Sequence, residues 1–194
     1  MKALKEKNIW VVPTQALAER WFNPDKDAES FAREPEMIYM KDETLKNWIT
    51  NKKNLMANPN FKTEDVRKFV AIRRKLIYEC QKNGVGLLLG SDGPQVFNVP
   101  GFSVHHELKY MVDAGLTPFQ ALQSGTVNVA KYFNLPNSGM IKTGYVSDLA
   151  LLDANPLENI ENTKKIAGVM LGINWLSKDM IKADLKSLEK KRSF

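Results

Sequence analysis

The chain has 194 residues, a 43% apolar fraction and a formal net charge of +6, which allow one domain with a sizeable core. Its apolar residues never run for the roughly 18 positions that a membrane-spanning helix needs, so we expect no membrane partner. The basic residues are mixed with acids or lie on helical polar faces, which argues against a nucleic-acid partner.

Cysteine content and the first residues bear on the compartment. Cys80 is the only cysteine, which excludes a disulfide framework and favours a reducing compartment. The apolar run after the basic start covers only Ile9 to Val12, too short for a signal-peptide core. We therefore expect a cytoplasmic location for this chain as it stands, and the location of a longer parent protein stays open.

The first third of the chain is predicted to hold a short helix, a short strand and a long polar insertion. Residues 1–8 have a helical pattern, and IWVVPT predicts a strand that Pro13 ends, because proline lacks the ladder donor. Residues 15–60 carry only short helical patterns, such as DAESFA and KDETLKNWITNKKNLM. A span of this length between strands is typical of a lid or of an insertion with its own small helices.

The middle of the chain is predicted to form a helix, a buried strand and a candidate site. The helix has Thr63 as its N-cap and ends at Asn83-Gly84, as a left-handed cap would. GVGLLLG then has the length and flanks of a strand buried on both faces, as in a parallel sheet under helices. Asp92 follows at the carboxyl end of this strand, where barrels and open α/β sheets bind ligands. Because Ser-Asp-Gly is also common turn chemistry, a turn aspartate is the alternative.

Two helices follow, and after them the sequence changes from helical to strand patterns. SVHHELKYMVDAGL is predicted to be helical up to Gly115, and TPFQALQSGTVNVAKYF to form one further helix with Thr117 as N-cap and Pro118 at its first position. After Asn134 we predict a strand at Leu149 to Leu152, and KKIAGVMLGINWL predicts two short strands or one bent strand. The terminal KSLEKKRSF is expected to be helical or frayed.

Four stretches in the correct order resemble the carboxy-terminal half of metal-dependent amidohydrolases, over residues 9–176. NIWVVPT is similar to the seventh strand of that family's barrel, and GVGLLLGSDG to the last strand. GFSVHHELKYMVDAGLTPFQALQSGTVNVAKYFNL resembles the following pair of helices, in which Thr126 and Asn128 match a motif expected to pack helix and loop. SGMIKTGYVSDLALLDANPLENI resembles the return of the chain into a small domain. The resemblance is closest to the branch of imidazolonepropionase and the prolidase-type dipeptidases.

This resemblance implies an α/β fold, with the last strands and helices of a (β/α)8 TIM-type barrel plus part of a small β-sandwich domain. We expect the barrel part in residues 1–134, with the helical insertion at 15–60, and the partial sandwich and tail in residues 135–194. Four aromatic residues of the insertion either line the mouth of the barrel or, as is commoner, pack within the insertion: Trp21, Phe22, Tyr39 and Trp48.

The resemblance assigns Asp92 as catalytic residue and metal ligand. In the family this aspartate binds the metal and takes a proton from the metal-bound water, whose pKa the metal lowers. His105 matches the histidine that begins the next helix, and is expected to face the substrate or support the site without binding the metal. A satisfied histidine in a first helical turn is the alternative. His106 stands where relatives commonly carry arginine and is expected at the surface, and Glu107 matches a family position without an assigned chemistry.

The chain departs from the family pattern in its histidines and its strand count. The family takes a His-x-His pair from the first strand and two more histidines from the fifth and sixth, whereas both histidines here follow Asp92. Only two predicted strands precede Asp92, and a closed barrel needs eight. We therefore interpret the chain as the final quarter of a barrel, from a truncated gene product, an internal start or a split enzyme.

Two functional hypotheses follow. The first is a metal-dependent hydrolase of C–N bonds in amides, cyclic amides or dipeptides, present as a carboxy-terminal fragment. It would bind a divalent metal, with zinc expected, only where the missing ligands are supplied, and its partners would be a small amide or peptide substrate and a complementary half or a second copy. The second is a non-catalytic remnant or association module that pairs with a complementary chain. Both outer strand edges are expected to be open, which favours association, and the isolated chain is expected to be inactive.

Overall fold

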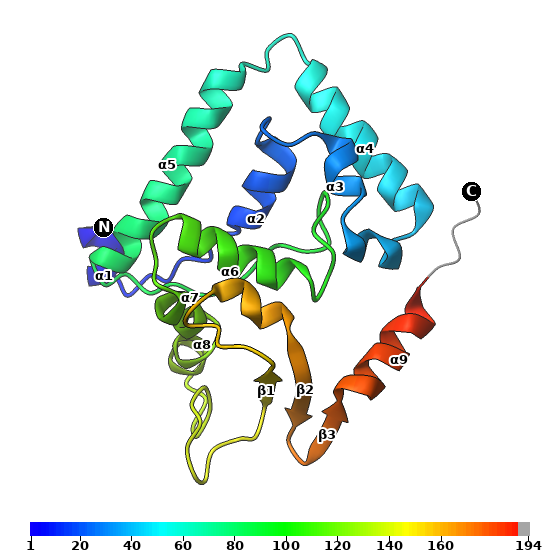
Figure 1. Cartoon of the computed structure of the whole chain (residues 1–194). Coiled ribbons are helices and arrows are strands. Elements are labelled where there is room, and N and C mark those ends of the chain that lie inside the picture. The colour runs from blue at the N-terminus through cyan, green and yellow to red at the C-terminus, as the bar shows by residue number, and fades with distance from the viewer. Residues whose placement is uncertain (190–194) are drawn as a thin grey trace.

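A computed structural model describes residues 1–189, with helices α4 and α5 meeting at one apex and a small sheet at the opposite end (Figure 1). No helix in this range is both long and apolar enough to cross a membrane. The elements in chain order are α1 (Lys2–Glu6), α2 (Gln15–Leu17), the π-helical turn η1 (Ala18–Phe22), α3 (Ala28–Ala32), the 3-10 turn η2 (Pro35–Tyr39), α4 (Asp42–Ala57), α5 (Thr63–Lys82), α6 (Ser103–Asp113), α7 (Pro118–Ser124), α8 (Val127–Tyr132), β1 (Leu149–Leu152), the 3-10 turn η3 (Ile160–Lys164), β2 (Ile166–Leu171), β3 (Asn174–Ser177) and α9 (Lys178–Leu188).

The two strands predicted before Asp92 are extended segments joined by a single parallel bridge. Val11 donates its N–H to the Gly86 carbonyl at 2.9 Å and accepts from the Leu88 N–H at 2.9 Å. The prediction of two full strands is therefore wrong, because each segment lacks a second strand neighbour within residues 1–189. The full strands of the described chain form the antiparallel sheet β1-β2-β3. The α/β class holds, and the assignment of these segments to the last part of a barrel and of the small sheet to a partial sandwich remains a prediction.

The outer edge of the 85–89 segment is closed by the turn between α7 and α8. The Leu89 N–H donates to the Ser124 carbonyl at 3.0 Å, and the Leu87 carbonyl accepts from Asn128 Nδ2 at 2.8 Å. The expectation that both edges are open is therefore wrong for this one, because a helix end and an amide side chain take the place of a strand. Asn128 has the packing role that its motif predicted.

The outer edge of the 9–12 segment is open. Because Val11 directs both of its backbone groups at the 85–89 segment, the neighbours Trp10 and Val12 direct theirs to the opposite side. Neither residue forms a hydrogen bond within the described part of the chain. The Trp10 ring covers Gly86 instead: a Cβ on Gly86 would lie 2.2 Å from the indole. This edge can accept a further strand.

Two apolar clusters make up the core. The first lies between α5, α6 and the 85–89 segment, and its buried members include Ile77, Leu87 and Met111. The second belongs to the insertion and contains Phe31 and Trp48 together with residues of the loop that follows Asp92. The insertion thus has its own core, as the sequence analysis allowed, and shares it with that loop.

Most local predictions agree with the structure, and two need correction. Gly84 has the predicted left-handed φ of 69°, and β1 spans the predicted Leu149–Leu152. Thr63, however, is the first residue of α5 and not its N-cap. The single helix predicted after Gly115 is broken into α7 and α8 at Gly125, because a Cβ there would lie 2.7 Å from a Leu89 methyl carbon and the chain must pass closely to close the 85–89 edge.

Candidate functional site

Asp92 lies beyond the carboxyl end of the 85–89 segment, with an exposed side chain. Because this segment runs parallel to residues 9–12, both segments end at the same side of the molecule. The Val12 side chain packs against Gly90 of the other segment, because a Cβ on Gly90 would lie 2.6 Å from a methyl carbon of Val12. Asp92 and the 13–16 turn are therefore neighbouring features of one edge.

Non-glycine residues with a left-handed backbone occur at this edge and in the loop that follows Asp92. Thr14, Asp92 and Phe97 have φ angles of 48°, 56° and 60°. The other non-glycine residues with positive φ in the described chain are asparagines, which tolerate this region well. A β-branched threonine and a phenylalanine do not, so the edge stores backbone strain of the kind that gathers at functional sites.

Two ionisable side chains hold the 13–16 turn. Glu107 of α6 is fully buried and accepts the backbone N–H of Gln15 at 2.9 Å and of Ala16 at 2.6 Å. Burial raises the pKa of Glu107 to about 7, against the lowering effect of those two hydrogen bonds. Arg73 of α5 donates to the Pro13 carbonyl at 2.5 Å. Glu107 has no role predicted from the sequence, although an acid beside Leu108 and one turn before Met111 on an apolar helix face is a signal for a buried carboxylate.

The loop of residues 92–102, called the Asp92 loop below, is closely folded. A Cβ on Gly93 would lie 3.3 Å from the Asn98 carbonyl oxygen and 3.0 Å from Ser103 Oγ. Ser103 Oγ also shares a 2.8 Å hydrogen bond with Ser91 Oγ, across the base of the loop. The residues on both sides of Asp92 are therefore packed against the other arm of its loop.

The two histidines face different partners. His105 Nδ1 lies 3.0 Å from Thr163 Oγ1 of η3, and burial, followed by the charge of Lys164, lowers the pKa of His105. No hydrogen bond joins His105 to Asp92 in residues 1–189, and its role toward substrate remains a prediction. His106 has a side chain only 15% exposed, 2.6 Å from Glu36 Oε1 of η2. The surface role expected for His106 is wrong, because η2 covers it.

One group of side chains in the described residues has the composition of a metal site. Atoms of Glu34, Glu36 and His106 lie within 4.8 Å of one another. Arg20 already bonds Glu34 and comes within 3.8 Å of Glu36, with a side chain 1% exposed. Burial alone would raise the pKa of Glu36, but the hydrogen bond to His106 and the nearby charges lower it to about 2. The guanidinium occupies the place of a cation, so we interpret this group as a salt-bridge network.

Asp92 belongs to no group of three potential metal ligands within residues 1–189. A hydrolytic metal centre uses three or more protein ligands, with histidine the common one. The described residues alone therefore do not fit such a centre at Asp92. A metal there needs ligands from outside the described residues.

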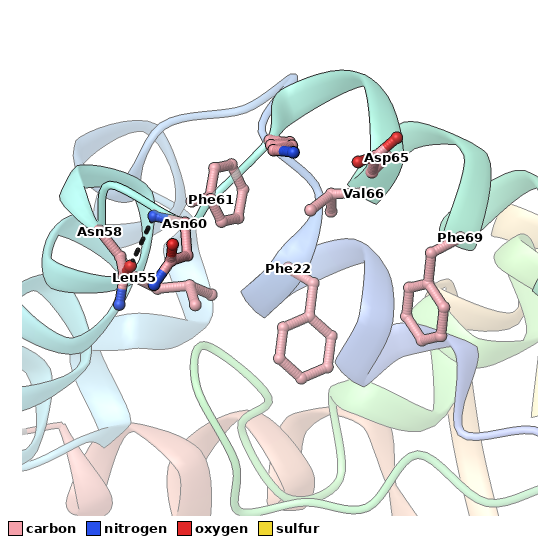
Figure 2. A pocket seen from close by; sticks show the side chains of 9 residues that line it. Phe22, Leu55, Asn58, Asn60, Phe61, Asp65, Val66 and Phe69 are labelled. Atoms are coloured by element: carbon pink, nitrogen blue, oxygen red, sulfur yellow. Dashed lines mark hydrogen bonds between the residues drawn. The ribbon is translucent and has the colours of Figure 1, made fainter.

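A cavity of about 490 Å³ lies where α4 and α5 meet, with Phe22 pointing toward it (Figure 2). Neither Asp92 nor His105 lines it, so this cavity is separate from the candidate site. Of the insertion's aromatic residues, Tyr39 stacks on Phe102 at 5.1 Å and Trp48 is buried in the insertion core. Trp48 packs within the insertion, as the commoner alternative predicted, whereas the ring partner of Tyr39 lies in the loop that follows Asp92. The cavity is lined by Phe22, Leu55, Asn58, Asn60, Phe61, Lys62, Asp65, Val66 and Phe69.

Comparison with known proteins decides the family. The model of the amidohydrolase family matches residues 1–176. The chain belongs to the amidohydrolase family. Among curated amidohydrolase relatives, adenine deaminase from Bacillus subtilis is 41% identical over 61 residues, which are 31% of this chain and 10% of that protein. Ochratoxinase from Aspergillus niger is 34% identical over 83 residues, which are 41% of this chain and 16% of that protein.

Solved amidohydrolase structures share the fold. A Xaa-Pro dipeptidase with bound methionine matches with a TM-score of 0.60 at 20% identity, over 91% of this chain and 37% of that one. A bottromycin amidohydrolase matches with a TM-score of 0.71 at 17% identity, over 92% and 40%. The predicted family and its likeness to prolidases are confirmed. The chain spans well under half the length of these relatives.

Proposed function

We propose that this chain is the carboxy-terminal part of a metal-dependent hydrolase of C–N bonds in small amides, cyclic amides or peptides. The observation that carries the proposal is the family match over residues 1–176, in a chain whose Asp92 follows the 85–89 segment at the edge where the parallel segments end. The names of the relatives, which include a dipeptidase and a deaminase, support C–N bond hydrolysis as the reaction class.

Asp92 is proposed as the metal-binding carboxylate and as the group that accepts a proton from the attacking water. Its carboxylate is exposed and can face a ligand supplied from outside the described residues. A bound divalent metal such as zinc would lower the pKa of water toward neutrality. His105 is proposed to support the site on the side of η3, through its bond to Thr163.

The metal ligands that the described residues lack must come from another part of the enzyme. We propose that the histidines come from a complementary amino-terminal part, either on a separate chain or in a longer form of this one. That part would contribute strands to the open 9–12 edge, whose Trp10 and Val12 backbone groups have no partners within residues 1–189. Residues 1–134 would then be the barrel part and residues 135–194 the partial small domain.

Zinc titration of the isolated chain tests the ligand count. We expect no binding at sub-micromolar zinc and no amide hydrolysis, because one exposed carboxylate is a poor site for an ion that prefers four nitrogen, sulfur or oxygen ligands. Isothermal calorimetry measures the binding, and Asp92→Asn is the matched control that should give the same result. Sub-micromolar zinc affinity that disappears in Asp92→Asn would contradict the shared-site proposal.

The open 9–12 edge also favours the second candidate function, an association module. We expect Val12→Lys to reduce self-association or capture of a complementary chain, because a charge on an exposed edge opposes strand pairing. Light scattering across protein concentrations measures the change. Ile173→Lys is the control, since Ile173 is 96% exposed in the turn between β2 and β3. Equal effects of the two substitutions would exclude the 9–12 edge as the contact.

A further inference from the structure

The Asp92 loop packs on the insertion and not on the bridged segments. In Figure 1 it rises from the start of α6 toward α3. Val96, Phe97 and Val99 are each at most 3% exposed and belong to the insertion's apolar cluster. The Phe97 ring stacks on Phe31 at 5.4 Å and meets Trp48 edge-on at 5.9 Å. The insertion therefore supplies the surface on which this loop is folded.

The buried cation of Arg20 joins the loop to the insertion. The Arg20 side chain, on η1, is 1% exposed, and its Nε donates to the Phe97 carbonyl at 2.7 Å. The other arm of the guanidinium bonds Glu34, next to Glu36. Glu36 in turn bonds His106 in the first turn of α6, just beyond the end of the loop. Arg20 thus contacts the middle of the loop directly and approaches Glu36, which bonds α6 just after the loop.

The residue whose carbonyl accepts the hydrogen bond from Arg20, Phe97, has a strained backbone. Phe97 has a φ of 60°, a conformation that a bulky residue adopts only when its surroundings hold it there. The next residue, Asn98, packs its carbonyl where a Cβ on Gly93 would lie only 3.3 Å away. Gly93 directly follows Asp92. Rotation of the backbone at Phe97 would therefore move the Asn98 carbonyl, which packs against Gly93.

The backbone of Arg20 is itself fixed. Lys52 of α4 is fully buried and donates to the carbonyls of Arg20 at 3.0 Å, Trp21 at 3.1 Å and Asn23 at 2.9 Å. These three bonds tie η1 to α4, the longest helix of the insertion. The backbone that carries the Arg20 side chain is consequently held in place by α4.

We propose that Arg20 is a positioning residue through which the insertion holds the Asp92 loop, and with it Asp92, in one conformation. The insertion is then a fixed support of this loop and not a moving lid. This rests on the proposed function only for the importance of Asp92; the contacts of Arg20 with the loop are independent of any reaction.

Amide hydrogen exchange of the isolated chain, read by NMR, tests the proposal without substrate or metal. The reporter is the Asn98 amide, which donates to the Gln95 carbonyl at 2.7 Å inside the loop. In Arg20→Ala we expect its exchange to accelerate by about ten- to a hundredfold, as the loss of a hydrogen bond to a charged donor implies. Arg20→Lys should recover part of the protection, because a lysine keeps the charge but not the fork that reaches both Phe97 and Glu34.

Two further measurements separate positioning from a general loss of structure. The carboxyl carbon shift of Asp92 should change in Arg20→Ala, while exchange at Val70 and Ile77 in α5 stays as in the wild type. Arg67→Ala is the control, because Arg67 is 47% exposed and pairs with Asp25 and Glu64 at the surface. If Arg20→Ala does not fold, Glu34→Gln replaces it, with a smaller acceleration at Asn98 expected.

Unchanged exchange at Asn98 in Arg20→Ala, or in Glu34→Gln where Arg20→Ala does not fold, would overturn the proposal. So would acceleration at Asn98 that only equals that of the α3 and α4 amides, with an unchanged Asp92 carboxyl shift, since Arg20 would then stabilise the insertion alone. A failure of the proposed hydrolase activity leaves these outcomes unaffected, so the two can be told apart.

Discussion

Asp92→Asn is expected to lower kcat by about 10²–10⁴ in an enzyme reconstituted with the missing part, while the fold is preserved. An asparagine oxygen can still coordinate a metal weakly, but the amide cannot accept a proton from the attacking water. The substitution is also conformationally mild. Asp92 has a φ of 56°, and asparagine is among the few residues that adopt this region readily.

The measurement is steady-state turnover, with circular dichroism to check the fold. Alanine is the poorer choice at this position, since a strained left-handed alanine would confound loss of chemistry with movement of the loop. Asp153→Asn is a suitable control because Asp153 is 44% exposed and pairs with Lys178 in the small sheet region. Near wild-type turnover in Asp92→Asn would exclude Asp92 as the proton acceptor and leave the turn interpretation.

Features set by neighbours in sequence were predictable. The left-handed Gly84 at the end of α5, the α7 start at Thr117-Pro118 and the β1 strand each depend on residues within a few positions. The α7 start even has the full capping box, in which Thr117 and Gln120 bond reciprocally. Local chemistry decides these elements, so periodicity and capping rules find them.

The bridged segments were predictable only in part. The apolar run of residues 85–89 indicated burial on both faces, and its direction relative to residues 9–12 agrees with the parallel bridge. A strand needs partners, however, and no local pattern states which partners are present. The Leu89 N–H bonds the Ser124 carbonyl and the Leu87 carbonyl accepts from Asn128, so the partners lie about 35 to 41 positions away in the sequence.

The polar contacts that hold the candidate site were missed for the same reason. Glu107 and Gln15 are 92 positions apart, and Arg20 and Phe97 are 77 apart. Each pair consists of a charged side chain and a backbone group, and a backbone group has no sequence signature. Only the charged residue can be suspected, when it stands on an otherwise apolar helix face as Glu107 does.

The contribution of Glu107 to the stability of the chain is expected to fall as the pH rises from about 4.5 to about 7. Burial raises the pKa of this carboxyl from 4.5 to about 7 in the folded chain. In this window the unfolded chain has lost the proton and the folded chain still holds it, so the folded state binds more protons and rising pH favours unfolding. The difference of about 2.5 pKa units corresponds to a loss on the order of 3 kcal/mol in the free energy of unfolding.

Glu107→Gln isolates this contribution, because glutamine cannot ionise. One amide oxygen can still accept a backbone N–H from Gln15 or Ala16, while its NH₂ group faces the other donor. The variant should therefore be less stable than the wild type at pH 5 and lose most of that disadvantage by pH 8. His105 acts in the opposite direction, because burial lowers its pKa and its contribution to stability therefore rises with pH. Since His105 is present in both proteins, this contribution cancels when the stability of the variant is compared with that of the wild type.

Urea unfolding of both proteins at a series of pH values between 4.5 and 8 measures the difference. Glu64→Gln serves as the matched control, because the Glu64 side chain is 73% exposed and its substitution should leave the pH dependence of the wild type intact. Parallel curves for the wild type and Glu107→Gln would mean that Glu107 is already ionised at pH 5 in the folded chain. The two backbone N–H groups of the 13–16 turn would then outweigh burial, and the turn would be held by a permanent carboxylate.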